Sequence, residues 1–290
     1  MKAGFVNIFG KPNAGKSTLV NALLGEKLAI VSGKVQTTRH RIKGFLTKPN
    51  EYQIVFSDTP GIIEPKYKLH ERMMQSVKGA LEDADIAILL VDAKHPPDES
   101  GLLFSSLRLK VPAIVVINKI DSVKAVTVKA LSDFFSQQTY CNKVVEISAK
   151  TNEGIDSLLA EVLNFLPEGE AFYNEDDISD LPTKFFVSEM IREKVYDLFT
   201  DEIPYHTAVV VTEFKEKQTL VKIGADVIVQ RESQKAILLG ERGSMIKKLG
   251  TLARIDIEKF LQQKVFLELF VKVRPKWRDN DSQLKEYGYF

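Results

Sequence analysis

The sequence opens with a short stretch whose residue types suit contact with phosphate groups. Gly10 and Gly15 enclose four residues, and Lys16 and Ser17 follow directly, between an apolar run at 5–9 and an amphipathic segment at 18–24. With this spacing the backbone N–H groups can turn toward a phosphate where a helix begins, while the lysine adds positive charge and the hydroxyl can ligate Mg²⁺. We therefore predict a nucleotide phosphate loop whose contacts come from Gly10, Lys11, Pro12, Asn13, Ala14, Gly15, Lys16, Ser17 and Thr18.

Three further polar motifs each follow a predicted strand, and parallel sheets bind ligands at the carboxyl ends of their strands. The first motif, Asp-x-x-Gly at 58–61, would let Asp58 hold Mg²⁺ and would bring the Gly61 N–H near a γ-phosphate. Asp-x-x-Gly recurs at 98–101, so position after a strand, and not the motif alone, selects the first copy. The three motifs are Asp58-Thr59-Pro60-Gly61, Asn118-Lys119-Ile120-Asp121 and Ser148-Ala149-Lys150.

The second of these motifs predicts which base is bound. The Asp121 carboxylate can accept two hydrogen bonds from the N1–H and N2–H₂ edge of guanine, whereas adenine lacks both donors and would leave a carboxylate unpaired. The backbone of 148–150 could meet the guanine O6. We therefore expect GTP and GDP, with Mg²⁺, as ligands.

Composition sets only broad limits on this chain. It has 290 residues, a net charge of +1 and a single cysteine, Cys141, so an intramolecular disulfide is impossible and a reducing compartment is expected. No apolar run approaches the ~18 residues of a membrane helix, and we find no secretion signal. These features predict a cytoplasmic protein.

The elements that must position these motifs alternate between strand and helix patterns as far as residue 166. This rhythm predicts an α/β phosphate-loop domain with a mostly parallel sheet and one antiparallel edge strand, because the turn at 48–51 joins two strands directly. We expect strands at 2–9, 39–46, 52–57, 85–91, 113–117 and 144–148, and helices at 17–24, 69–81, 99–109, 125–138 and 155–165.

A change of pattern after residue 166 predicts the domain boundaries. Residues 167–182 contain six acidic residues and no basic one, without helical or strand periodicity, which is typical of a linker. We therefore divide the chain into a nucleotide-binding domain at 1–166, an acidic linker at 167–182 and an α+β domain at 183–290. In the last we expect helices at 184–199 and 244–261 and strands at 207–214, 219–230, 236–239 and 265–273.

A second motif, Gly-x-x-Gly, precedes the expected helix at 244–261. Such a loop lets a single-stranded nucleic-acid backbone approach closely, as in KH domains, although the motif is weak alone and an unliganded helix start is the rival interpretation. Basic residues cluster around it, but Glu241 inside the clamp opposes RNA. The predicted RNA contacts are Gly240, Glu241, Arg242, Gly243, Lys247, Lys248 and Arg254.

The four nucleotide motifs together resemble the translation-factor-related GTPases across residues 1–166. The resemblance implies a first switch at Thr37 and Thr38, one of which would ligate Mg²⁺ beside Ser17 and Asp58; the sequence does not decide which. Ile62 stands where Ras-like proteins carry a catalytic glutamine. We therefore expect Lys16, Asn13 and Thr38 to serve catalysis, with Asn13 either holding K⁺ against the phosphates or only stabilising its loop.

The order of the two domains resembles the Era family of bacterial ribosome-assembly GTPases along essentially the whole chain, with local matches at 36–41, 185–187, 191–194, 231–235 and 264–269. The resemblance implies binding to small-subunit ribosomal RNA near its 3′ end and to the assembling small subunit, peripheral contact with the inner face of the cell membrane, and no obligate protein partner. A rival reading is an RNA-binding assembly protein that senses GTP with little hydrolysis. A tRNA-modifying GTPase is disfavoured, because the chain lacks a second catalytic domain.

Overall fold

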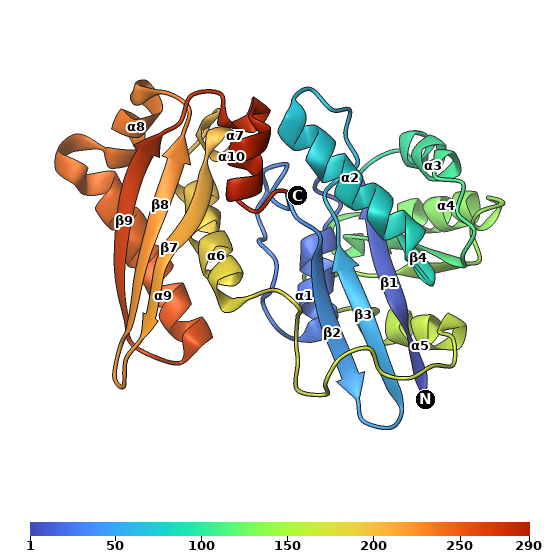
Figure 1. The fold of residues 1–290 in the computed structure, drawn as a ribbon. Coiled ribbons are helices and arrows are strands. Elements are labelled where there is room, and N and C mark those ends of the chain that lie inside the picture. Colours follow the sequence, from blue (N-terminus) through green and yellow to red (C-terminus); the bar gives the residue numbers. More distant parts are fainter. The chain divides into compact units, whose positions relative to one another are not determined.

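The computed structural model describes all 290 residues, which divide into two compact units. One unit consists of Met1–Glu64 and Met73–Asp180, and the other of Pro65–Arg72 and Leu181–Phe290. The ribbon in Figure 1 shows the larger unit as a sheet flanked by helices and the smaller one as three strands with helices beside them.

The first unit is a mixed sheet of six strands in the order β2-β3-β1-β4-β5-β6. β2 and β3 are antiparallel, and every other neighbouring pair is parallel, as predicted. The strands are β1 (Lys2–Gly10), β2 (Ile42–Lys48), β3 (Tyr52–Asp58), β4 (Ile86–Asp92), β5 (Ala113–Asn118) and β6 (Lys143–Glu146). The helices are α1 (Lys16–Leu24), α2 (Lys68–Glu82, which belongs to this unit from Met73 onward), α3 (Pro97–Ser106), α4 (Ala125–Ser136) and α5 (Ile155–Phe165), with a 3₁₀ turn at Ile120–Ser122.

Helices cover both faces of this sheet, which explains why its central strands read as continuous apolar runs. Leu19 from α1 and Leu158 from α5 pack on one face. Phe104 from α3 and Leu131 from α4 pack on the other, together with residues of α2. The two layers hold the sheet rigid, so the loops at the carboxyl ends of its strands start from fixed points.

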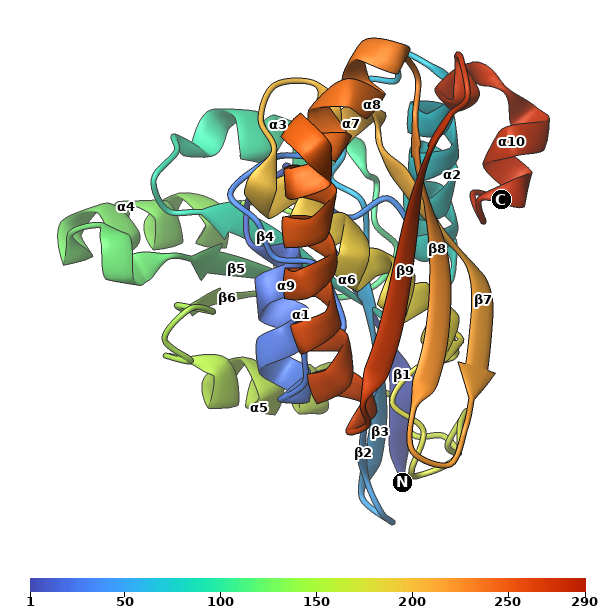
Figure 2. The ribbon, with the colours of Figure 1, turned by 90° about the vertical axis from the view of Figure 1, so that its left-hand side faces the viewer.

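The second unit is a three-stranded sheet with helices packed against it, seen side-on in Figure 2. Its order is β7-β8-β9, with β7 antiparallel and β9 parallel to β8. Val187 and Ile191 of α6 and Leu249 and Ile257 of α9 share the core with β8. The elements are α6 (Thr183–Leu198), α7 (Ile203–His206), β7 (Ala208–Glu216), β8 (Val221–Val229), α8 (Glu232–Leu239), α9 (Ser244–Leu261), β9 (Val265–Val273) and α10 (Asp281–Glu286), with 3₁₀ turns at Glu241–Gly243 and Trp277–Asp279.

One predicted element of this unit is wrong. The run at 236–239 is not a strand but the last turn of helix α8, which begins at Glu232. A four-residue apolar run does not distinguish a buried strand from a helix, and here Gln234 and Leu238, one helical turn apart, are the buried positions. The Gly-x-x-Gly loop therefore joins two helices, α8 and α9, and not a strand and a helix.

The acidic segment after α5 packs on the first unit as far as Asp180. The side chain of Gln53, fully buried in β3, accepts hydrogen bonds from the N–H groups of Phe172 and Tyr173 at 2.7 and 3.0 Å. The Tyr173 ring stacks on Phe45 of β2 at a centroid distance of 3.8 Å. The Phe45 N–H also donates to the Ile178 carbonyl. These contacts fix the segment on β2 and β3.

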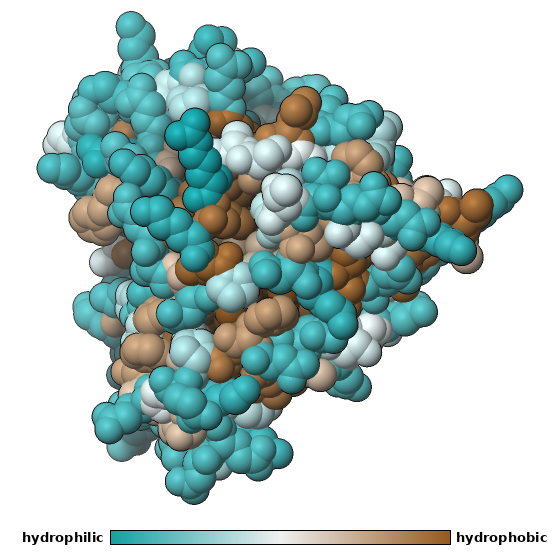
Figure 3. All heavy atoms as spheres, turned by 90° about the vertical axis from the view of Figure 1, so that its right-hand side faces the viewer, coloured by the Kyte–Doolittle hydropathy of each residue, from teal (hydrophilic) through white to brown (hydrophobic).

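The surface is polar over most of the face drawn in Figure 3, where hydrophilic side chains surround small apolar groups. None of the helices is long and apolar enough to span a bilayer.

Candidate nucleotide and RNA sites

The predicted phosphate loop lies between β1 and α1, and its backbone requires its glycines. Gly15, the residue before α1, has φ = 100°, and a Cβ built there would lie 2.3 Å from the Asn118 amide nitrogen. A Cβ on Gly10 would lie 2.6 Å from the Leu90 carbonyl oxygen. Neither position has room for a side chain, because the loop packs against the ends of β4 and β5.

Lys16 supplies the positive charge of this loop from a buried position. Its Nζ donates to the carbonyl oxygens of Gly10 and Lys11, at 3.2 and 3.0 Å, so the ammonium lies inside the loop. Burial lowers the pKa of Lys16 to about 8, and the Asp58 carboxylate partly opposes this shift. A phosphate entering the loop would restore the stability of the charged form.

Ser17, Thr38 and Asp58 form a buried corner beside Lys16. The Ser17 Oγ donates to Asp58 Oδ2 at 2.7 Å, and the Thr38 hydroxyl lies 2.9 Å from both the Ser17 Oγ and the same carboxylate oxygen. Asp58 is 0% exposed, and its Oδ1 has no hydrogen-bond partner. Burial raises the pKa of Asp58, while the hydrogen bond from Ser17, the charge of Lys16 and the hydroxyl of Thr38 act against this.

This corner fits a divalent cation. Hydroxyl and carboxylate oxygens are the ligands that Mg²⁺ prefers, and a buried carboxylate oxygen without a partner is costly unless a cation or its water satisfies it. The structure also separates the two switch threonines, which the sequence could not do. Both line the pocket, and the hydroxyl that reaches Ser17 and Asp58 in the corner is that of Thr38.

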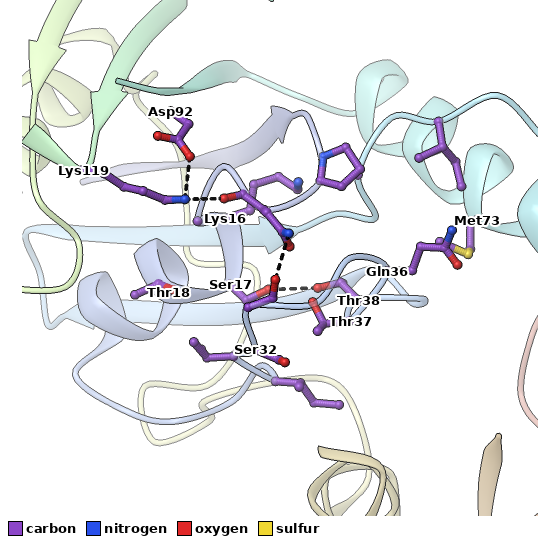
Figure 4. Close-up of a pocket in the computed structure, with 18 of the residues that line it drawn as sticks. Lys16, Ser17, Thr18, Ser32, Gln36, Thr37, Thr38, Met73, Asp92 and Lys119 are labelled. Atoms are coloured by element: carbon purple, nitrogen blue, oxygen red, sulfur yellow. Dashed lines mark hydrogen bonds and ion pairs between the residues drawn. The ribbon is translucent and has the colours of Figure 1, made fainter. Parts of the chain in front are cut away.

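A pocket of about 360 Å³ joins the loop and this corner, as Figure 4 shows. Several residues of its lining were not predicted, among them Ser32, Gln36, Met73 and Asp92. Ser32 and Gln36 lie in the switch segment, the loop at 25–41 between α1 and β2 that contains Thr37 and Thr38; its spacing gives no signal for them, and Met73 on α2 has none either. Asp92 could have been noticed because it ends a buried strand, as Asp58 does. The lining consists of Pro12, Asn13, Gly15, Lys16, Ser17, Thr18, Ile30, Val31, Ser32, Gly33, Gln36, Thr37, Thr38, Gly61, Ile63, Met73, Asp92, His95 and Lys119.

The predicted base-binding motifs meet at the ends of β5 and β6. Asp121 accepts hydrogen bonds from the hydroxyls of Ser148, at 2.6 Å, and Ser122, at 2.9 Å, and these bonds lower the pKa of its carboxyl. The Asn118 side chain donates to the Ala14 carbonyl and accepts from the Ala149 N–H, at 2.9 and 3.0 Å. The base loop is thereby fixed to the phosphate loop, with an ionised carboxylate at its exposed end.

Some predicted contact residues do not line this pocket. Lys11 forms an ion pair with Glu99 of α3. The Thr59 hydroxyl is buried and donates to the Ile8 carbonyl at 2.6 Å, Pro60 is buried beside it, and Lys150 is exposed. These side chains support or flank the loops, and their roles toward a nucleotide stay predictions.

The residue after Gly61 has no catalytic side chain. Ile62 packs against the core cluster of Phe9 and Val77, and its N–H donates to the Gly10 carbonyl at 3.3 Å. Asn13, in contrast, projects from the phosphate loop with a positive φ of 62°, and its Nδ2 donates to the Gly33 carbonyl of the switch segment at 3.0 Å. The phosphate loop and the first switch are thus joined through an amide side chain.

In the second unit, the Gly-x-x-Gly loop lies beside an apolar groove of about 370 Å³. Arg242, Lys247, Lys248 and Arg254 are exposed around the loop and the first turns of α9. The groove extends the predicted contacts to β9, which the motif alone did not indicate. Its lining consists of Ile246, Lys247, Gly250, Thr251, Arg254, Val265, Phe266, Leu267 and Leu269.

A phosphate loop, a buried cation corner and a guanine-type base loop on this sheet define a GTP-binding domain of the GTPase class, followed by a KH-type domain. Two family models match accordingly: one described as a 50S ribosome-binding GTPase at residues 5–119, and a KH domain at residues 202–278.

Similar proteins match over the full chain. GTPase Era of Geobacter sp. (strain M21) is 44% identical, with 99% of this chain and 98% of that protein covered, and GTPase Era of Ruminiclostridium cellulolyticum is 41% identical, with 99% and 97% covered. The chain therefore belongs to the Era family of GTPases, and the predicted class and fold are confirmed.

Two solved structures show the same fold with ligands bound. Era in complex with MgGDPNP and nucleotides 1506–1542 of 16S ribosomal RNA has a TM-score of 0.95 and 41% identity, covering 100% of this chain and 99% of that one. A variant of Aquifex aeolicus Era bound to GDP and AlF4⁻ has a TM-score of 0.94, with the same identity and coverage.

Proposed function

We propose that this chain binds and hydrolyses GTP and couples its nucleotide state to the binding of small-subunit ribosomal RNA near the 3′ end, in assembly of the small ribosomal subunit. The observation that carries the nucleotide half is the corner of Ser17, Thr38 and Asp58, with one buried carboxylate oxygen unpaired. The groove beside the Gly-x-x-Gly loop supports the RNA half.

Mg²⁺ would be held by the Ser17 and Thr38 hydroxyls next to Asp58, and it would neutralise charge on the β- and γ-phosphates. Lys16 would hold the same phosphates, and Thr38 would respond to the γ-phosphate because it lies on the switch segment. Asp121 would select guanine by accepting from its N1–H and N2–H₂ groups. Ile62 is half-buried against the core and its side chain has no polar group, so positioning and charge must carry the chemistry.

A K⁺ ion is a further candidate for the positive charge that would stabilise the phosphates during hydrolysis. Asn13 already contacts the switch carbonyl of Gly33, so its amide oxygen and carbonyls of this segment could hold a monovalent cation beside the phosphates. We expect hydrolysis to be faster in K⁺ than in Na⁺ at equal ionic strength, and Asn13→Ala to remove the difference. Equal rates in the two salts would return Asn13 to a structural role.

Coupling to RNA is tested by measuring affinity in different nucleotide states. We expect GTP with Mg²⁺ to tighten binding of a single-stranded segment from the 3′ end of 16S RNA, and the RNA to tighten GTP binding by the same factor. Gly243→Asp should abolish RNA binding, because it puts a side chain and a negative charge into the loop. Identical RNA affinity in the GTP, GDP and nucleotide-free forms would refute the coupling.

Measuring phosphate release under multiple-turnover conditions distinguishes the proposed enzyme from the rival function, a sensor of GTP with little hydrolysis. The proposed enzyme releases many phosphates per chain, and Ser17→Ala, which removes a cation ligand, serves as the inactive control. Release limited to one turnover would favour the sensor.

Peripheral contact with the cell membrane stays a prediction, tested by cosedimentation with anionic lipid vesicles.

A further inference from the structure

A carboxylate outside the predicted nucleotide motifs, that of Asp92, lines the pocket that joins the phosphate loop and the corner of Ser17, Thr38 and Asp58. Asp92 is the last residue of β4 and is paired in register with Asn118 of β5, directly before Lys119. Its Oδ2 accepts from the Lys119 ammonium at 2.6 Å, as the dashed line in Figure 4 marks. The acid thus lies one strand away from the base loop and contacts it through a single side chain.

Asp92 is held in this place by several contacts. Its side chain is 10% exposed, and its Oδ1 accepts from the Lys94 N–H at 3.0 Å. The exposed ring of His95 approaches Oδ2 at 3.8 Å from the solvent side. The carboxylate is mostly buried while the Lys119 side chain is 31% exposed, so this charged bond is partly shielded from water, and the acceptor is fixed by its own backbone turn.

The pair determines where the Lys119 side chain lies. Lys119 has φ = 67°, its Cε passes 3.9 Å from the Cβ position of Gly15, and its Nζ also donates to the Asn13 carbonyl at 2.7 Å. The ammonium is therefore occupied by Asp92 and by the phosphate loop. The apolar stem of the lysine is left to form part of the pocket wall.

We propose that Asp92 is a positioning residue for nucleotide binding, which acts by holding Lys119 across the phosphate loop and, through Lys119, holding Asn13. The inference rests on the proposed GTP site. Asp92 makes no contact of its own with the nucleotide and affects binding only through Lys119. The resulting chain of contacts runs from Asp92 to Lys119, from Lys119 to Asn13, and from Asn13 to Gly33 of the switch.

A double-mutant cycle on GDP affinity tests the proposal. Asp92→Asn and Lys119→Met are made singly and together, and Asp133→Asn, an exposed acid on α4 outside the site, controls for loss of one negative charge. Thermal unfolding without nucleotide reports folding. If Asp92→Asn does not fold, Asp92→Glu, which keeps the charge but moves it by one methylene, takes its place in the cycle.

With Lys119 present, we expect Asp92→Asn to weaken GDP binding by about tenfold or more, since the ammonium of Lys119 then faces a neutral amide in place of a carboxylate. In the Lys119→Met background the same change should leave GDP affinity unchanged or raise it, because it removes a carboxylate that has lost its lysine partner and lies near the phosphate loop. Equal losses in both backgrounds would overturn the proposal. Wild-type protein that does not bind GDP would instead refute the proposed function.

Discussion

Replacing Gly15 with alanine should damage two motifs at once, because the new methyl group would meet the base loop. The Cβ would lie 2.3 Å from the Asn118 amide nitrogen, which donates to the Ala14 carbonyl from a residue only 2% exposed. The positive φ of 100° costs an alanine roughly 1–2 kcal/mol. Displacing the amide from a buried bond adds about 1–3 kcal/mol.

Gly25→Ala provides a matched control for this variant. Gly25 also has a positive φ, 70°, but a Cβ there meets nothing within 4 Å. Both variants should therefore share the backbone strain, and only Gly15→Ala should add the clash. We expect its thermal midpoint to fall below that of Gly25→Ala by roughly 2–4 °C for each of the extra kcal/mol.

Nucleotide affinity is the second readout of this pair. Gly15→Ala should weaken GDP binding by roughly tenfold, about 1.4 kcal/mol, because the phosphate loop and base loop move apart, whereas Gly25→Ala should leave it unchanged. Titration calorimetry with GDP and Mg²⁺ measures both. Equal stability and equal GDP affinity in the two variants would show that Asn118 yields at no cost, and the rigid link between the loops would be refuted.

Three further predictions follow from the sites. Because the pKa of Lys16 is lowered to about 8 and phosphates favour its charged form, GDP affinity should be constant below that pH and fall as pH rises through it; calorimetry should detect proton uptake there, and a flat profile would contradict the buried charge. Asp121→Asn should shift preference from GTP to xanthosine triphosphate, since the amide can donate to the carbonyl that xanthine carries in place of the 2-amino group of guanine. Unchanged selectivity in competition binding would place the base site away from Asp121 and its partner Ser148. Gly240→Ala should weaken RNA binding in a filter assay, because its Cβ would lie 2.9 Å from the Met245 nitrogen and distort the loop; wild-type affinity would place the RNA elsewhere.

The sequence by itself determined where the predicted nucleotide motifs lie in the fold, because their places depend on local spacing. Gly15, Lys16 and Ser17 lie within one turn, and Asp58 and Asn118 end buried strands that run parallel to β1 and β4, so the sequence alone places them at one edge of the sheet. The antiparallel pair of β2 and β3 also followed from the short turn between them.

Tertiary structure decided whatever depends on which side chains meet across the sheet. Thr37 and Thr38 are equivalent in spacing, and only the path of the switch brings the Thr38 hydroxyl to Asp58. The apolar run that ends at Leu239 is too short to show a period, so the sequence alone cannot distinguish the end of α8 from a strand. The tertiary structure also decided how the acidic segment after residue 166 packs, because its contact with β3 depends on the side chain of Gln53, an uncharged residue in a distant strand.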